Sequence, residues 1–100
     1  MIYIITCLDK PGALPLRMQH IDAHRTYLAE SPIRTLVSGP LVGADGKTMK
    51  GSFFMVEADS REAVERFHVE DPLYRAGVWE TRIIEAFFKR VDNLSPKPRE

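Results

Sequence analysis

The fold of this chain is decided by residues 33–58, which read IRTLVSGPLVGADGKTMKGSFFMVEA. Residues 33–42 alternate with the two-residue period of a β-strand. The segment 43–47 has the turn chemistry of a hairpin, because Asp45-Gly46 favours positive φ. Residues 51–58 are rich in aromatic and apolar side chains and are typical of a return strand. The stretch therefore predicts an antiparallel β-hairpin at the centre of the chain.

A strand and a helix are expected before this hairpin. Residues 2–8 are β-branched and aromatic and end at a turn cluster, 9–12. Apolar residues then recur at helical spacing from Leu14 to Glu30, and Pro15 suits the first helical turn. Ser31-Pro32 ends this helix, because a residue before proline is driven out of the α region. The apolar stripe expected to share one face consists of Leu14, Met18, Ile21 and Leu28.

A helix and a strand are also expected after the hairpin. Ser60 is a good N-cap for the second helix, with Asp59 as a competing candidate. Asp71-Pro72 begins a short helical turn, which Gly77 closes. Residues 78–88 form the last strand. The side chains expected on the inner face of the second helix are Ala63, Val64 and Phe67.

The resulting order, β-α-β-β-α-β, predicts an α+β, ferredoxin-like fold with a four-stranded antiparallel sheet and two helices on one face. We expect residues 1–90 to form one domain and residues 91–100 to form a polar, proline-rich and flexible tail. One hundred residues are enough for a single core, since a chain of this length buries roughly two-thirds of its unfolded surface.

The last strand is apolar on both faces. Trp79, Ile83 and Phe87 alternate there with a second set, Ile84, Ala86 and Phe88. One set packs on the helices, so the other set needs a cover of its own. We therefore predict a homodimer in which the open faces of two sheets meet.

The composition limits the class of protein. Lys plus Arg balance Asp plus Glu at 14 each, so no charge favours nucleic acid or an anionic membrane as a partner. The single thiol, Cys7, suits a reducing compartment and a small buried side chain. The N-terminus lacks the basic lead-in of a signal peptide, and no apolar run approaches the roughly 18 residues of a membrane span. These features predict a soluble, cytoplasmic protein.

Two residues could carry proton-transfer chemistry. His24 lies midway along the first predicted helix, and Asp71 opens the segment 71–77. A carboxylate that holds an imidazole in one tautomer makes a general acid–base pair, and histidine changes charge near neutral pH. Each residue also has a plain structural role open to it, His24 as a boundary histidine and Asp71 as an N-cap. The two roles of Asp71 can coexist, one oxygen for an amide and one for the imidazole.

Three further residues are candidates for substrate binding. Arg17 shares the helix side of His24 and is either a clamp for an anionic or phenolate group or a solvated arginine. Ser38 could donate a hydrogen bond and Gly39 could allow close backbone approach, where Ser38-Gly39-Pro40 ends the second strand. His20 and His24 have the i, i+4 spacing of metal ligands, but nothing completes a shell. We expect no metal and no cofactor.

Taken in order, these features resemble the YCII-like (YciI-related) family from Ile2 to Phe88. The features that carry the resemblance are Arg17-x6-His24, Gly39-Pro40, Gly51, Asp71-Pro72, Ala76-Gly77-Val78 and the strand from Ile84 to Phe88. The resemblance implies a ferredoxin-like fold that pairs into a dimeric α+β barrel, and an active site centred on His24 and Asp71. Suggested activities of the family involve breakdown of halogenated or hydroxylated aromatics. Leu73 departs from the aromatic residue of many relatives, which we expect to alter the pocket wall.

The sequence thus leads to two main hypotheses, beside a third in which the domain is only a dimerisation scaffold with no cavity near His24. The first is a small cofactor-independent enzyme, a lyase, isomerase or dehydrohalogenase that moves protons on a small cyclic or aromatic compound through His24 and Asp71. The second is a non-catalytic dimeric module that binds a small ligand in the same cavity. Replacement of His24 by Gln separates them, because glutamine keeps hydrogen bonding but loses basicity.

Overall fold

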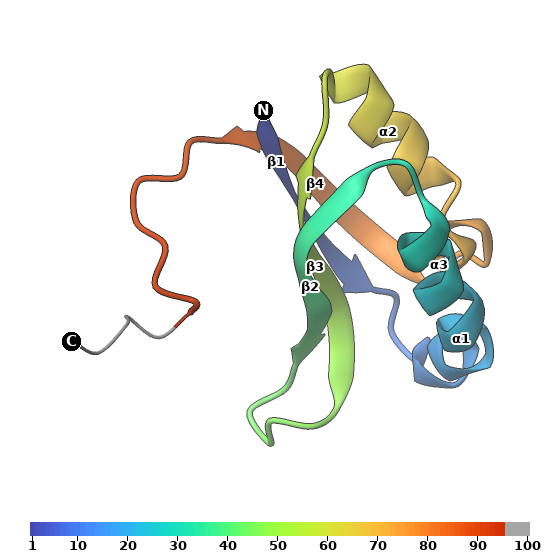
Figure 1. The fold of residues 1–100 in the computed structure, drawn as a ribbon. Helices are drawn as coiled ribbons and strands as arrows, with labels where there is room; N and C mark the ends of the chain where they lie inside the picture. The colour runs from blue at the N-terminus through green and yellow to red at the C-terminus, as the bar shows by residue number, and fades with distance from the viewer. Residues whose placement is uncertain (96–100) are drawn as a thin grey trace.

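The structure is a computed structural model and describes residues 1–95 of the chain. A four-stranded antiparallel sheet in the order β2-β3-β1-β4 carries its helices on one face (Figure 1). This is the predicted α+β, ferredoxin-like fold, and the prediction is confirmed. The elements are β1 (Ile2–Asp9), α1 (Leu14–Glu30), β2 (Arg34–Val42), β3 (Met49–Glu57), α2 (Arg61–Val69), α3 (Pro72–Arg75) and β4 (Trp79–Phe87).

The hydrophobic core lies between the sheet and the helices. Alternate residues of β1 point into it, and Ile5 pairs with Phe54 on one side and Ile84 on the other. Cys7 is fully buried, and burial raises the pKa of its thiol to about 12. Other side chains with almost no exposure are Val56, Val64, Leu73 and Val78. These side chains form one hydrophobic core between the sheet and the helices, as the split βαβ pattern predicted.

Local capping follows the sequence. The Ser60 side chain accepts a hydrogen bond from the amide of Ala63 at 3.1 Å, so Ser60, and not Asp59, is the N-cap of α2. Gly77 closes α3 with a φ of 76°. None of the helices in residues 1–95 is long and apolar enough to cross a membrane.

The buried face of α1 differs from the expected apolar stripe. Leu14 and Met18 are exposed, and the two buried residues of the helix are Arg17 and His24. The stripe prediction was wrong for these two apolar positions, and so was the solvated alternative for Arg17. The reason is that the inner side of α1 faces the carboxylates of Asp9 and Asp71. These carboxylates pair with Arg17 and His24, and a buried charged or polar side chain requires such a partner.

The second strand ends at Val42, as predicted from residues 33–42, and Ser38-Gly39-Pro40 lies within it and does not end it. Gly39 lies opposite Phe53 and Pro40 opposite Ser52. A proline is tolerated there because β2 is an edge strand, where a missing N–H need not break the ladder. On the neighbouring strand, a Cβ added at Gly51 would collide with the carbonyl oxygen of Cys7, so only glycine fits.

The other face of the sheet has no helix over it (Figure 1). Ile83 and Phe87 lie on this open face with 60% and 36% exposure, which settles which set of the last strand faces away from the helices. Trp79, which the sequence placed with them, is instead in the core, because a register shift between Leu8 and Asp9 interrupts the alternation at the start of β4. By strand register the open face also carries Ile2, Ile4, Val37, Leu41, Phe53 and Met55.

Candidate active site

The structure brings His24 and Asp71 into contact, although they are 47 positions apart in the sequence. His24 Nδ1 lies 2.8 Å from Asp71 Oδ2 and 2.9 Å from Asp71 Oδ1. Their exposed fractions are 8% for His24 and 1% for Asp71. Because α1 packs on α3, the middle of the long helix faces the start of the short one. The imidazole and the carboxylate therefore form a buried pair.

Asp71 fills both roles that the sequence left open. As the N-cap of α3 its Oδ1 accepts the amide hydrogen of Leu73 at 2.8 Å. The same carboxylate faces His24 Nδ1, and a carboxylate only accepts hydrogen bonds. The hydrogen of a neutral His24 therefore sits on Nδ1, which leaves Nε2 with a free lone pair. The cap also prevents Asp71 from turning away, so the tautomer is held by the backbone of α3.

A cavity of about 250 Å³ opens beside this pair. His24 lines it from α1, and Ser38 and Gly39 line it from β2. Phe54 meets the imidazole edge-on, with 5.8 Å between ring centroids and 71° between ring planes. All three substrate-binding candidates, Arg17, Ser38 and Gly39, thus border the cavity that His24 borders.

Arg17 is held by a network that the sequence did not reveal. Its Nε and Nη2 donate to the two carboxylate oxygens of Asp9, both at 2.8 Å. Nη2 also donates to Ser52 Oγ at 2.7 Å and to the carbonyl oxygen of Gly51 at 2.9 Å. Only 1% of Arg17 is exposed. The guanidinium is therefore rigid and its charge is balanced inside the cavity wall.

Asp9 and Ser52 are the site residues that sequence analysis missed. Asp9 was interpreted only as part of a turn, and Ser52 only as part of a strand. One signal was available for Asp9: Arg17 shares the inner side of its helix with His24, and a buried arginine requires a nearby carboxylate. Nothing local in the sequence marks Ser52, which lies 35 positions from Arg17.

Leu73 does not form part of the cavity wall. Its side chain is fully buried in the core, and the neighbouring Tyr74 borders a different hollow with Lys10 and Trp79. The expectation that the departure at this position alters the pocket is therefore wrong. The His24 cavity is lined by residues of α1, β2 and β3.

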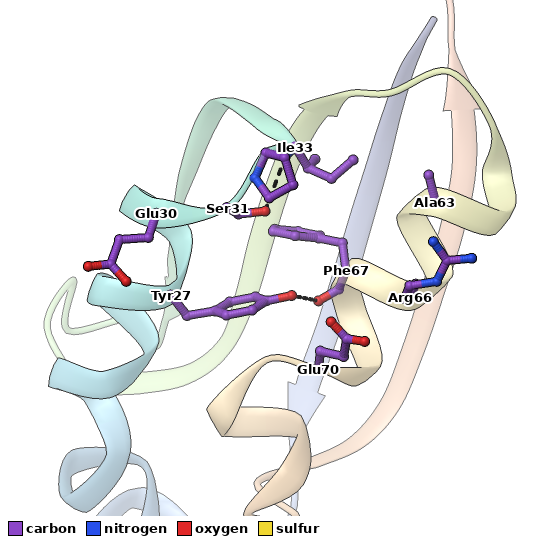
Figure 2. Close-up of a pocket in the computed structure, with 9 residues that line it drawn as sticks. Tyr27, Glu30, Ser31, Ile33, Ala63, Arg66, Phe67 and Glu70 are labelled. Carbon is purple, nitrogen blue, oxygen red and sulfur yellow. Dashed lines mark hydrogen bonds between the residues drawn. The ribbon is translucent and has the colours of Figure 1, made fainter.

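A second hollow, of about 400 Å³, lies between the end of α1 and α2 (Figure 2). Tyr27 and Phe67 stack there, with 5.6 Å between ring centroids, and Tyr27 Oη donates to the carbonyl oxygen of Phe67 at 2.7 Å. Burial raises the pKa of Tyr27 to about 12, so the phenol stays protonated near neutral pH. Neither His24 nor Asp71 lines this hollow, which lies between two helices.

Metal ligands do not gather in the part of the chain that the structure describes. Among residues 1–95 no three side chains of His, Cys, Asp and Glu lie close enough to hold an ion. His20 lies one turn before His24, but the Nδ1 of His24 is turned toward Asp71. The i, i+4 spacing of the two histidines thus gives no cluster.

Comparison with known proteins identifies the family of this chain. Residues 1–88 match the YCII-related domain. The chain belongs to the YCII-related family. It is 31% identical to the protein YciI of Escherichia coli and of Shigella flexneri over 96 residues, which is 89% of this chain and 98% of each relative. The resemblance expected from the sequence is confirmed.

Two solved structures extend the comparison. A 5-chloro-2-hydroxyhydroquinone dehydrochlorinase from Burkholderia phenoliruptrix, solved with 2,5-dihydroxybenzoquinone, is 36% identical with a TM-score of 0.80. The match covers 88% of this chain and 94% of that chain. An antibiotic biosynthesis monooxygenase is 14% identical with a TM-score of 0.55, over 89% of this chain and 100% of that chain. The second likeness shows the fold alone.

Proposed function

We propose that this YCII-related protein is a small enzyme that uses the His24–Asp71 pair to eliminate halide from a hydroxylated, halogenated aromatic ring. The observation that carries the proposal is the contact of His24 Nδ1 with both oxygens of buried Asp71, beside a cavity of about 250 Å³. The similar dehydrochlorinase supports the reaction class, and its quinone ligand supports the size and chemistry of the substrate.

The elimination needs a group that is both base and acid. When a chlorinated hydroxyhydroquinone loses hydrogen chloride, two hydroxyl protons leave oxygen. One is taken up by the ring carbon that carried chlorine, and the other departs with chloride; the product is a hydroxyquinone. No external electron acceptor is consumed. His24 Nε2 takes a hydroxyl proton and returns a proton to carbon, while Asp71 stabilises the imidazolium between the two steps.

The remaining candidates position the substrate. Arg17 is locked by Asp9, so its guanidinium presents a fixed positive edge to an oxygen that gains charge as its proton leaves. Because Asp9 balances that charge, the cavity suits a neutral phenol or monoanion better than a dianion. Ser38 is a hydrogen-bonding group on the β2 side of the cavity. Gly39 borders the same cavity from β2.

The assembly in this proposal is a homodimer. The open face carries apolar side chains on all four strands, including Ile4, Met55 and Ile83. When the open faces of two copies meet, each face covers the apolar side chains of the other. This is the isologous contact of a two-fold dimer. The cavity of His24 lies on the helix side of the sheet and stays free.

The test is release of chloride from 5-chloro-2-hydroxyhydroquinone by the purified protein and two variants. His24→Gln should lose turnover, and His20→Gln, the same change one helical turn away, should keep it. Equal rates in both variants would remove His24 from the mechanism.

The rival binding module has its own signature in the same assay. It predicts no chloride release by the parent protein, with binding of 2,5-dihydroxybenzoquinone that survives His24→Gln. An isothermal titration with that quinone, run on the parent and both histidine variants, distinguishes the two functions.

A further inference from the structure

The segment after β4 carries three large apolar side chains that are exposed to water. Phe88, Val91 and Leu94 have exposed fractions of 80%, 75% and 72%. Two side-chain hydrogen bonds are local to this segment: Lys89 Nζ donates to Asp92 Oδ2, and the amide of Leu94 donates to Asp92 Oδ1. We call residues 88–94 the C-terminal arm. Its large apolar side chains are left in water when the domain is alone.

The arm extends toward one particular side of the molecule. Figure 1 shows it leaving the end of β4 and running on the side of the sheet opposite the helices, away from the body of the domain. The radius of gyration, 14.4 Å, agrees with this, because a compact chain of one hundred residues has about 13 Å. The arm thus occupies the space in front of the open face and does not fold back onto it.

The spacing of the three apolar residues is also regular. They recur every third residue, at positions 88, 91 and 94. Charged side chains lie between them, Lys89, Arg90 and Asp92. Exposed apolar side chains that gather on one segment are suited to packing on another surface.

We infer that the C-terminal arm is a clasp that packs against a second copy of this chain. The inference rests on the proposed pairing of open faces, since that pairing puts the second copy on the side to which the arm extends. Two-fold symmetry makes the exchange reciprocal: each copy contributes one arm and receives one. The arm thereby buries Phe88, Val91 and Leu94, which the isolated domain leaves exposed.

Sedimentation equilibrium of three proteins tests the clasp. The arm variant carries Phe88→Ser, Val91→Ser and Leu94→Ser, and the control carries Leu14→Ser and Met18→Ser on the exposed face of α1. We expect the parent to be a dimer, the arm variant to dissociate with a Kd at least tenfold higher, and the control to match the parent. A Kd unchanged in the arm variant overturns the clasp and leaves the pairing intact, whereas a parent that stays monomeric overturns both.

A cross-linking experiment identifies what the arm touches. A photoreactive benzoylphenylalanine replaces Leu94, and light and ¹⁵N-labelled copies are mixed and allowed to exchange subunits. Cross-linked peptides that join a light to a heavy segment support the clasp. Cross-links found only within one isotope show that the arm contacts its own chain, and this result overturns the inference. Neither measurement uses turnover, so failure of the proposed elimination is seen separately in the chloride assay.

Discussion

The two buried histidines of this protein have opposite surroundings. His24 faces the carboxylate of Asp71 on one side and a cavity on the other. His68, on α2, stacks on Trp79 with 4.9 Å between ring centroids and meets the edge of Tyr74 at 5.2 Å. Its Nε2 has no hydrogen-bond partner among the described residues.

The difference shows what burial alone does to an imidazole. Desolvation lowers the pKa of His68 to about 4, so it stays neutral and behaves as an aromatic core residue. The two histidines are close in the fold, since the amide of Asp71 donates to the carbonyl oxygen of His68 at 3.2 Å. A carboxylate partner and a cavity, more than burial, thus separate the proposed acid–base residue from the structural one.

The largest effect should come from His24→Gln. Loss of a general acid–base group lowers turnover about 10²–10⁴-fold. The glutamine amide can still donate to Asp71, so the free energy of unfolding should change by no more than about 1 kcal/mol. Chloride release and urea denaturation measure the two quantities. A large loss of stability with turnover retained would put His24 in the same class as His68.

Asp71→Asn should have the next largest effect. The asparagine oxygen can keep the bond to the Leu73 amide, but it no longer provides an acceptor-only group for His24. We expect turnover to fall by about 10²-fold or more, because Nε2 is no longer held as the free nitrogen. Long-range ¹H–¹⁵N spectra should show Nδ1–H in the parent and a mixture of tautomers in the variant. An unchanged spectrum and rate would leave Asp71 as a helix cap only.

The free energy of unfolding should depend on pH through the protonation of His68. The unfolded chain takes up a proton on this imidazole near its ordinary pKa of 6.5, whereas the folded protein does so only near 4. The stability that neutral His68 supplies is therefore complete above pH 6.5 and is lost as pH falls toward 4. The loss amounts to on the order of 3 kcal/mol.

Urea denaturation at pH 7 and pH 4.5 measures this loss, with His68→Gln as the comparison. The variant has no imidazole to protonate at this position, so its stability should fall less between the two pH values. If the parent and the variant lose the same free energy of unfolding between the two pH values, groups other than His68 cause the acid sensitivity. The contrast between His68 and His24 would then be weaker.

The smallest effect should come from the third histidine. His20 lies on α1, is half-buried, and is not among the residues that line the His24 cavity. His20→Gln should leave turnover unchanged and alter the free energy of unfolding by less than about 0.5 kcal/mol. The same denaturation and chloride assays measure it, and a larger change would mean that residues beyond Asp71 influence this helix face.

Much of the architecture followed from local patterns. The alternation over 33–42 and the Asp45-Gly46 turn predicted the central hairpin, and Ser60 and Asp71 predicted two helix starts. The face of α1 was predicted poorly, because its apolar positions mark no clear side while its buried positions are an arginine and a histidine. The face of Trp79 was missed because a register shift breaks the alternation that the argument used.

The amino-acid sequence by itself determined the order of elements, their caps and the family to which the chain belongs. These depend on residues a few positions apart, whose spacing is visible in the sequence. Only the tertiary structure decided that His24 meets Asp71, and that Arg17 is buried against Asp9 and Ser52. Such contacts depend on strand register, on the way α1 lies across the sheet and on side-chain reach, none of which is specified by local interactions.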